Sequence, residues 1–285
     1  MSNIFFNAQH SPIGAFASFT LGFPGPKGGL GLELGKPADQ DVYIGIQADD
    51  SNVYRTLPFH TVDIGDSEAR RFDILAEQDH AGSGKQPIKL VPFNSSDIVR
   101  EYSLGMDTWR AGGLAFRIYT PMQLVPDPEN AVGEQLRQAL VPALLVEMRI
   151  DSTGGRTTRR AFFGYRGNDP YTGMRKLDDT AEGLAGVGQA RHTAIASRDP
   201  GVWSALGFTI EDILSIDANG ETAFGLGNVG ALCVDVPAGE VRTYVARYGG
   251  EEFVVIAPET DREERSRWQS VCGVRSKVSP GRFVR

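Results

Sequence analysis

Turn-forming residues interrupt this chain at short intervals and leave little room for long helices. The 285 residues include 34 glycines and 16 prolines, a larger share than an average globular chain contains. Between the turns lie short apolar segments rich in β-branched and aromatic residues, at residues 42–48, 53–59, 88–93 and 98–104. Many short strands at close spacing are typical of sandwiches and barrels. The sequence therefore predicts an all-β fold, an antiparallel β-sandwich with few short helices.

Two stretches predict β-hairpins. In the first, Gly112 and Gly113 precede the apolar run 114–119, and glycine readily adopts the positive φ that a tight turn requires. In the second, residues 143–150 largely alternate between apolar and polar positions, and an extended pattern resumes at 157–165 after a turn rich in Ser, Thr and Gly. A period of two indicates strands and not helix.

Four further segments carry a prediction. Residues 229–236 and 241–248 are extended. Residues 130–140 have helical propensity, and Pro142 ends that helix. Residues 202–206 fit a single turn of helix. These segments add two strands and two short helices to the sandwich.

The first forty residues divide into apolar strands and irregular connections. Residues 4–6 and 14–23 are apolar and extended, and a polar turn joins them. Residues 24–40 contain so many glycines and prolines that they predict a loop or a pair of turns.

The carboxy-terminal end differs in kind. Residues 260–263 have the form of a capping box, and Glu263 lies four residues before Arg267, so a charged helix is predicted over 261–271. We expect a sandwich domain over residues 1–248. Residues 249–285 are expected to form a divergent tail, either a linker or the product of a shifted reading frame.

Charge and cysteine content limit the partners and the compartment. Lys and Arg number 29 against 36 Asp and Glu, a net charge of −7, which argues against nucleic acid and against anionic membrane surfaces as partners. Only Cys233 and Cys272 are present, too few for a disulfide framework. The first six residues show no basic start of a leader peptide. We therefore expect a cytoplasmic protein.

The common local signatures of catalysis are weak here. The segment 225–230 matches G-x-G-x-x-G by letter, but the residues after it are extended and Pro237 follows, so no helix begins there to hold a pyrophosphate. The histidines His10, His60, His80 and His192 are scattered, and no two cysteines are close. The sequence predicts neither a metal site nor a cofactor.

Neutral polar residues and aromatic residues are the candidates for sugar binding. Asn7 and His10 lie in the polar turn between apolar strands, where amide and imidazole groups suit sugar hydroxyls, although an ordinary turn has the same composition. Five aromatic residues either form a platform for a sugar ring or belong to the core. They are Trp109, Tyr119, Phe162, Phe163 and Tyr165.

Four long segments carry a resemblance to a known family. Residues 4–34 (IFFNAQHSPIGAFASFTLGFPGPKGGLGLEL), 160–180 (RAFFGYRGNDPYTGMRKLDDT), 204–214 (SALGFTIEDIL) and 224–240 (FGLGNVGALCVDVPAGE) resemble glycoside hydrolase family 52, the β-xylosidases, in the family's order and spacing. The resemblance covers the chain from about residue 3 to about residue 245.

The resemblance implies a two-domain enzyme, in which this amino-terminal β-sandwich precedes an (α/α)6 barrel that is absent from this chain. Such an enzyme releases xylose from xylo-oligosaccharides with retention of configuration, using a Glu and an Asp of the barrel and no cofactor. The chain by itself is then catalytically incomplete. On this basis Asn7 and His10 are expected to reach the sugar, and Asp169, Tyr171 and Arg175 are expected at the boundary with the barrel. Exposed apolar surface at that boundary would favour a homodimer or aggregation.

Two other functions fit the same residues. A free-standing carbohydrate-binding module would use the polar turn and exposed aromatic residues. A small sandwich enzyme would pair Glu147 with an acid on a neighbouring strand, because residues opposite each other on adjacent strands share one face.

Overall fold

The computed structural model describes the chain in separate stretches. They are residues 6–10, 16–21, 27–31, 41–49, 51–60, 87–103, 105–119, 125–139, 143–167, 172–178, 182–189, 193–218 and 227–249. For the first three stretches only the backbone is described. The predicted helix at 261–271 lies outside these residues, so it stays a prediction.

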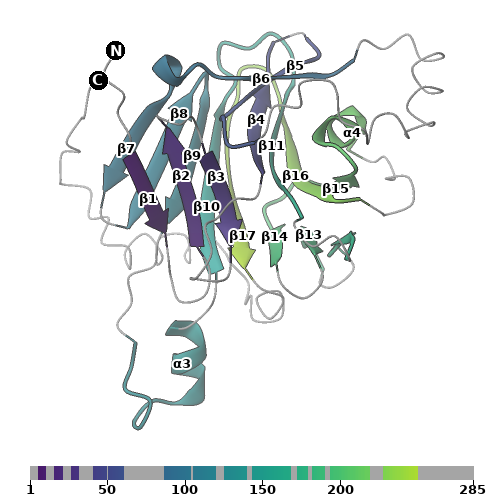
Figure 1. The fold of residues 1–285 in the computed structure, drawn as a ribbon. Coiled ribbons are helices and arrows are strands. Elements are labelled where there is room, and N and C mark those ends of the chain that lie inside the picture. The colour runs from purple at the N-terminus through teal and green to yellow at the C-terminus, as the bar shows by residue number, and fades with distance from the viewer. Residues whose placement is uncertain are drawn as a thin grey trace.

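The described chain is an all-β sandwich, as the sequence predicts (Figure 1). An eight-stranded sheet has the order β12-β13-β14-β17-β10-β9-β8-β7, and a six-stranded sheet has the order β15-β16-β11-β4-β5-β6. Neighbouring strands are antiparallel except β5 and β6, which are parallel.

The strands of the eight-stranded sheet are β7 (Val99–Ser103), β8 (Met106–Ala111), β9 (Leu114–Tyr119), β10 (Ala143–Asp151), β12 (Met174–Lys176), β13 (Ala185–Gln189), β14 (Thr193–Ser197) and β17 (Val241–Gly249). Those of the six-stranded sheet are β4 (Val42–Gln47), β5 (Val53–Thr56), β6 (Lys89–Pro92), β11 (Arg159–Arg166), β15 (Val202–Gly207) and β16 (Val229–Val236). A single 3-10 turn, η1 (Ser95–Asp97), follows β6.

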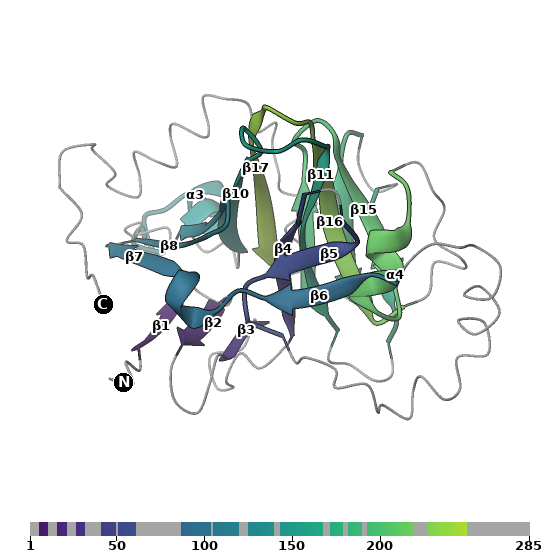
Figure 2. The same ribbon diagram turned by 90° about the horizontal axis from the view of Figure 1, so that it is seen from above.

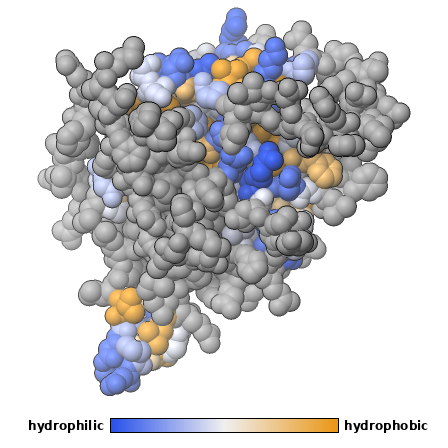
Figure 3. Space-filling model, in the orientation of Figure 1, coloured by the Kyte–Doolittle hydropathy of each residue, from blue (hydrophilic) through white to orange (hydrophobic). Residues whose placement is uncertain are grey.

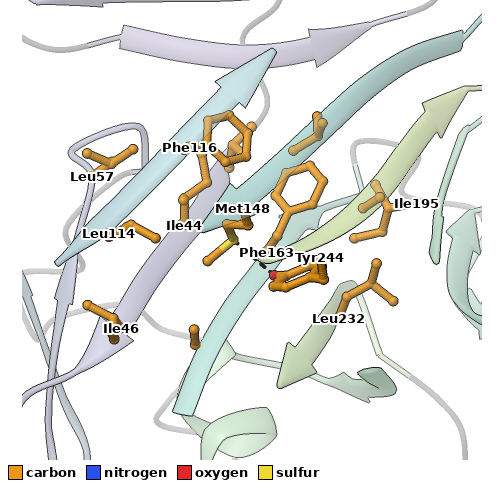
Figure 4. Packing of buried hydrophobic residues seen from close by; sticks show 14 of the residues in the cluster. Ile44, Ile46, Leu57, Leu114, Phe116, Met148, Phe163, Ile195, Leu232 and Tyr244 are labelled. Atoms are coloured by element: carbon orange, nitrogen blue, oxygen red, sulfur yellow. Dashed lines mark hydrogen bonds between the residues drawn. The ribbon is translucent and has the colours of Figure 1, made fainter. Parts of the chain in front are cut away.

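The core lies between the two large sheets (Figure 4). Phe116 of β9 packs against Phe163 of β11 with ring centroids 5.4 Å apart, which joins the sheets at their centre. The Tyr244 hydroxyl donates to Met148 Sδ at 2.9 Å and so satisfies its polar atom within the apolar layer. Burial of large aromatic side chains dominates the stability of such a core.

A short helix covers the outward face of the six-stranded sheet. Helix α4 (Ile210–Ser215) buries Ile213 and Leu214 against Phe162 and Cys233 of β11 and β16. It begins with a capping box, because Thr209 Oγ1 accepts from the Asp212 amide at 3.2 Å and Asp212 Oδ2 accepts from the Thr209 amide at 2.8 Å. The second helix, α3 (Gly133–Ala139), lies within the predicted helical segment 130–140 and confirms that prediction.

A third, smaller sheet contains β1 (Phe6–His10), β2 (Phe16–Leu21) and β3 (Lys27–Gly31) in that order. Strand β2 lies next to β10, and β3 lies next to β4. Figure 1 shows the sheet in front of β8–β10, and Figure 2 shows it as a separate layer beside them. The predicted polar turn is therefore wrong in part, because Asn7 and His10 belong to β1. The predicted loop at 24–40 is also wrong in part, because the proline-free residues 27–31 pair with β2.

One predicted hairpin is confirmed and the other is wrong. Gly112 and Gly113 form the turn between β8 and β9 with φ of 53° and 87°. Strands β10 and β11, predicted as a hairpin, lie in different sheets. After β10 the Ser152 amide donates to the Glu240 carbonyl at 2.8 Å, and the chain crosses to the second sheet. Alternation indicates a strand but not its neighbour, which explains the error.

Residues 202–207 form the strand β15 and not the predicted turn of helix. Val202 and Leu206 face the core between the sheets, whereas Trp203 and Ala205 face the cluster beneath α4. This alternation is that of a strand with two buried faces. The strands predicted at 42–48, 53–59, 88–93, 98–104, 229–236 and 241–248 are confirmed.

Candidate functional site

The outward face of the eight-stranded sheet carries a buried polar cluster. Strand β9 turns Leu114, Phe116 and Ile118 toward the core, so its alternate residues Arg117 and Tyr119 face outward. Glu147 of β10 lies opposite Arg117 in the register. We call Arg117, Tyr119 and Glu147 the Glu147 cluster.

Glu147 is held by two donors within this cluster. Its side chain is 7% exposed, and its Oε1 forms an ion pair with Arg117 Nη1. The Tyr119 hydroxyl donates to Oε2 at 3.3 Å. Burial, and next the negative charge of Glu147, raise the pKa of Tyr119 to about 12, so this phenol is a neutral donor at physiological pH. Because both of its oxygens are engaged by donors from β9, this carboxylate joins β9 to β10 across the sheet face.

The polar face continues along the same register. Thr108 of β8 lies beside Arg117, and Glu101 of β7 lies beside Thr108. Arg110 Nη2 donates to Glu101 Oε2 at 3.2 Å. The Thr108 hydroxyl is buried and finds no hydrogen-bond partner among the residues that the structure describes. Across the four strands the face therefore presents Glu147, Arg117, Thr108 and Glu101 in a row, so acidic residues lie at both ends of the row.

The structure contradicts the hypothesis that Glu147 forms a catalytic pair with an acid on a neighbouring strand. The residues opposite Glu147 are Arg117 on β9 and Val245 on β17. Retaining hydrolysis needs two carboxyl groups about 5–5.5 Å apart. A cation and an apolar side chain occupy the two positions from which such a partner would come.

The predicted site residues lie in two separate parts of the molecule. Asn7 and His10 are in β1, at register positions opposite Thr20 and Ala17 of β2, and their side chains lie outside the described part of the structure. Arg175 is exposed on β12, the edge strand of the eight-stranded sheet, and β13, β14 and β17 lie between it and β10. Asp169 and Tyr171 lie outside the described residues.

The chain on either side of residues 168–171 is fixed by backbone hydrogen bonds. The Gly167 amide donates to the Asn228 carbonyl at 2.7 Å, and the Met174 amide donates to the Gly227 carbonyl at 2.9 Å. Gln189 Nε2 donates to the Thr172 carbonyl at 2.7 Å. Two of the family-like segments, 160–180 and 224–240, therefore meet here, next to Arg175.

Two glycines of the segment 225–230, Gly227 and Gly230, are needed for close packing. Strand β16 begins at Val229, within the segment, which confirms that no helix follows it. A Cβ on Gly227 would overlap the backbone of Gly207, and one on Gly230 would lie 2.8 Å from Val187 and Met174. These close approaches exclude larger residues.

The five aromatic residues considered as a sugar platform are all buried. Their exposed fractions are 0% for Trp109, Phe162, Phe163 and Tyr165, and 6% for Tyr119. Tyr165 also donates to the Thr193 carbonyl at 3.0 Å. The core interpretation is confirmed for all of them except Tyr119, which is buried on the outward face in the Glu147 cluster.

Sequence reasoning missed Arg160, which organises the outward face of the six-stranded sheet. Its Nε donates to Asp235 Oδ1 at 2.8 Å, and its Nη1 donates to the carbonyls of Leu214 and Ile216 at 3.1 Å and 2.5 Å, at the end of α4. The guanidinium lies over the Trp203 ring at 4.8 Å. The available signal was the pair Arg159 and Arg160 at the start of a strand that continues with apolar residues, because a charge beside buried residues requires partners.

Other reactive groups in the described residues do not form a site. Cys233 is fully buried, and burial raises the pKa of its thiol to about 12, which makes it a poor nucleophile. Among those residues, no three His, Cys, Asp or Glu side chains gather as metal ligands would. Within the same ranges no helix has the length and apolar character needed to cross a membrane.

The fold and the polar face define a β-sandwich domain in which Glu147, the buried carboxylate of the polar face, is neutralised by Arg117. Its sequence matches the model of Glycosyl hydrolase family 52 over residues 19–250. The chain therefore belongs to glycosyl hydrolase family 52, as the resemblance implied.

Two curated relatives are both named beta-xylosidase and both come from Geobacillus stearothermophilus. One is 53% identical over 245 residues, which cover 85% of this chain and 34% of the relative. The other is 41% identical over 254 residues, which cover 87% of this chain and 40% of the relative. The chain thus spans well under half the length of these relatives.

Proposed function

We propose that this chain is the amino-terminal β-sandwich domain of a retaining β-xylosidase that acts on xylo-oligosaccharides, and that it is catalytically incomplete alone. The observation that carries the proposal is the span of the match, 34% and 40% of two relatives named beta-xylosidase. The domain occupies residues 1–248, and the catalytic Glu and Asp belong to the (α/α)6 barrel that the remainder of such an enzyme would supply.

The chemistry of the described residues supports this division of roles. A retaining glycosidase needs one carboxylate as nucleophile and one carboxylic acid as proton donor. Glu147 is bound by Arg117 and Tyr119, so it is engaged in the sheet face. We assign to this domain the shaping of the site mouth, with Asn7 and His10 directed to the sugar and Asp169, Tyr171 and Arg175 directed to the barrel. A cytoplasmic location accords with its two cysteines.

The test is hydrolysis of an aryl β-xyloside by the purified chain, free of host glycosidases. We expect no turnover above the blank, with the 53% identical beta-xylosidase as the positive control. Turnover that follows the purified chain through a second chromatographic step would contradict the proposal. Calorimetry with xylobiose should be run in parallel, because saturable binding would identify a carbohydrate-binding module instead.

A further inference from the structure

The segment that carries α3 projects from the sandwich. In Figure 1, α3 lies beyond the lower ends of the strands, and it takes no part in the extensive contacts that join the described strands and α4 to one another. Figure 3 shows the same segment as the lowest lobe of the molecule, with hydrophobic residues on its surface. We call residues 125–139 the α3 arm.

Apolar side chains of the arm are exposed. Val132 is 66% exposed and Val125 is 49% exposed. Single exposed apolar residues are common on protein surfaces, but these two belong to a segment whose helix has no extensive contact with the other described elements. A helix of seven residues, the length of α3, is not stable in water by itself. The arm therefore needs a partner surface.

Local hydrogen bonds nevertheless give the arm a defined shape. Asp127 Oδ1 accepts from the Glu129 amide at 3.0 Å, and Asp127 Oδ2 accepts from Asn130 Nδ2 at 2.7 Å. At the start of α3, Gln135 Oε1 accepts from the Val132 amide at 3.1 Å. These bonds hold Val132 in one position before any partner binds, which lowers the entropic cost of docking.

The length of the relatives indicates what covers the arm. The chain spans 34% of the relative that is 53% identical to it, so most of that relative is polypeptide to which this chain has no counterpart. We propose that the α3 arm docks through Val125 and Val132 on that second domain, an inference that rests on the proposed function. Because Asp127 and Glu129 are exposed beside these valines, the receiving surface is an apolar groove with basic residues on its rim.

The test compares thiol labelling of Val132→Cys in two proteins. The first is this chain, and the second is a full-length chimera in which residues 1–248 replace the matched part of the 53% identical beta-xylosidase. Maleimide labelling is followed by peptide mass spectrometry, which separates this position from other cysteines. Val241→Cys is the matched control, because Val241 is 45% exposed and lies opposite Asp151, at the end of β10 away from Ala143.

We expect Val132→Cys to label at least about tenfold more slowly in the chimera than in the chain, while Val241→Cys labels alike in both. Equal rates for Val132→Cys in the two proteins would overturn the proposal. Slower labelling of Val132→Cys in the chain alone as the protein concentration rises would also overturn the proposal, because a second copy of the chain would then cover the α3 arm. If the chimera does not unfold cooperatively, the cysteine is placed instead in the natural relative, at the position that aligns with Val132. Its labelling rate is then compared with that of Val132→Cys in this chain. Xyloside hydrolysis by the chain alone would refute the proposed function and leave the labelling result intact.

Discussion

At the scale of single residues, Glu147 shows how a charge is accommodated on a covered sheet face. Its side chain is 7% exposed, and Arg117 and Tyr119 supply its donors. Removal of one member of such a pair leaves the other charge without its partner, whereas replacement of both by apolar residues is often nearly neutral. Alternation along 143–150 predicted the position of Glu147 on this face. The identity of its partner depended on which strands lie beside β10, and the sequence pattern does not contain that information.

We expect Glu147→Gln to lower the free energy of unfolding by about 2 kcal/mol, because a partly buried guanidinium loses its counter-charge. The double variant Glu147→Met with Arg117→Met should lose less stability than Glu147→Gln. Urea unfolding measures the free energy of unfolding of each variant. Arg149→Gln, on the same strand but in an ion pair whose side chains are 38% and 32% exposed, is the control and should leave stability nearly unchanged. A Glu147→Gln variant that is no less stable than this control would contradict the claim that Glu147 is the counter-charge of Arg117.

Buried tyrosines predict the response of the sandwich to alkaline pH. Burial raises the pKa of Tyr54 and of Tyr119 to about 12 in the folded chain, from 10.0 for a free phenol. Between pH 10 and 12 the unfolded chain therefore loses these protons and the folded chain retains them, so the free energy of unfolding falls as pH rises. Below pH 10 both states hold the protons and the contribution is complete.

Urea unfolding at pH 9, 10 and 11 tests this, with Tyr119→Phe as the comparison. The variant should show a shallower loss of stability above pH 10, because phenylalanine has no proton to lose. Parallel pH profiles for the two proteins would show that Tyr119 ionises equally in both states.

At the scale of elements, strand positions were predictable and strand neighbours were not. Apolar alternation and turn residues located β4, β5 and β16, because these signals are local in the sequence. The assignment of β10 and β11 to one hairpin was wrong because a crossing between sheets produces the same local pattern. Strand β15 was predicted as a turn of helix for another reason. A strand that is buried on both faces has no polar side, so its period of two is not visible in the sequence.

The attachment of α4 depends on Arg160, which joins the end of this helix to β11 and β16. We expect Arg160→Ala to lower the free energy of unfolding by about 2–3 kcal/mol, because two carbonyls and the Asp235 carboxylate lose a charged donor. Arg156→Ala, at an exposed position before β11, is the control and should change little. Equal stability of the two variants in urea unfolding would show that α4 is held by its apolar side chains alone.

At the scale of the whole molecule, the family segments located the domain better than they located its site. The matched region, residues 19–250, contains every described strand of both large sheets. The predicted sugar-binding residues lie on β1, whereas Arg175, predicted at the domain boundary, lies on the edge strand β12. A second domain would have to contact both places. Under the proposed function the sugar site lies where the two domains meet, which is why no segment of this chain carries its complete signal.

The chimera of residues 1–248 with the remainder of the 53% identical beta-xylosidase tests the central claim most directly. Its kcat/KM on an aryl β-xyloside should lie within about tenfold of the parent enzyme, a difference of about 1.4 kcal/mol in transition-state stabilisation. The chain alone should show none. A chimera that unfolds cooperatively yet does not hydrolyse the xyloside would contradict the claim that this sandwich is the amino-terminal domain of such an enzyme.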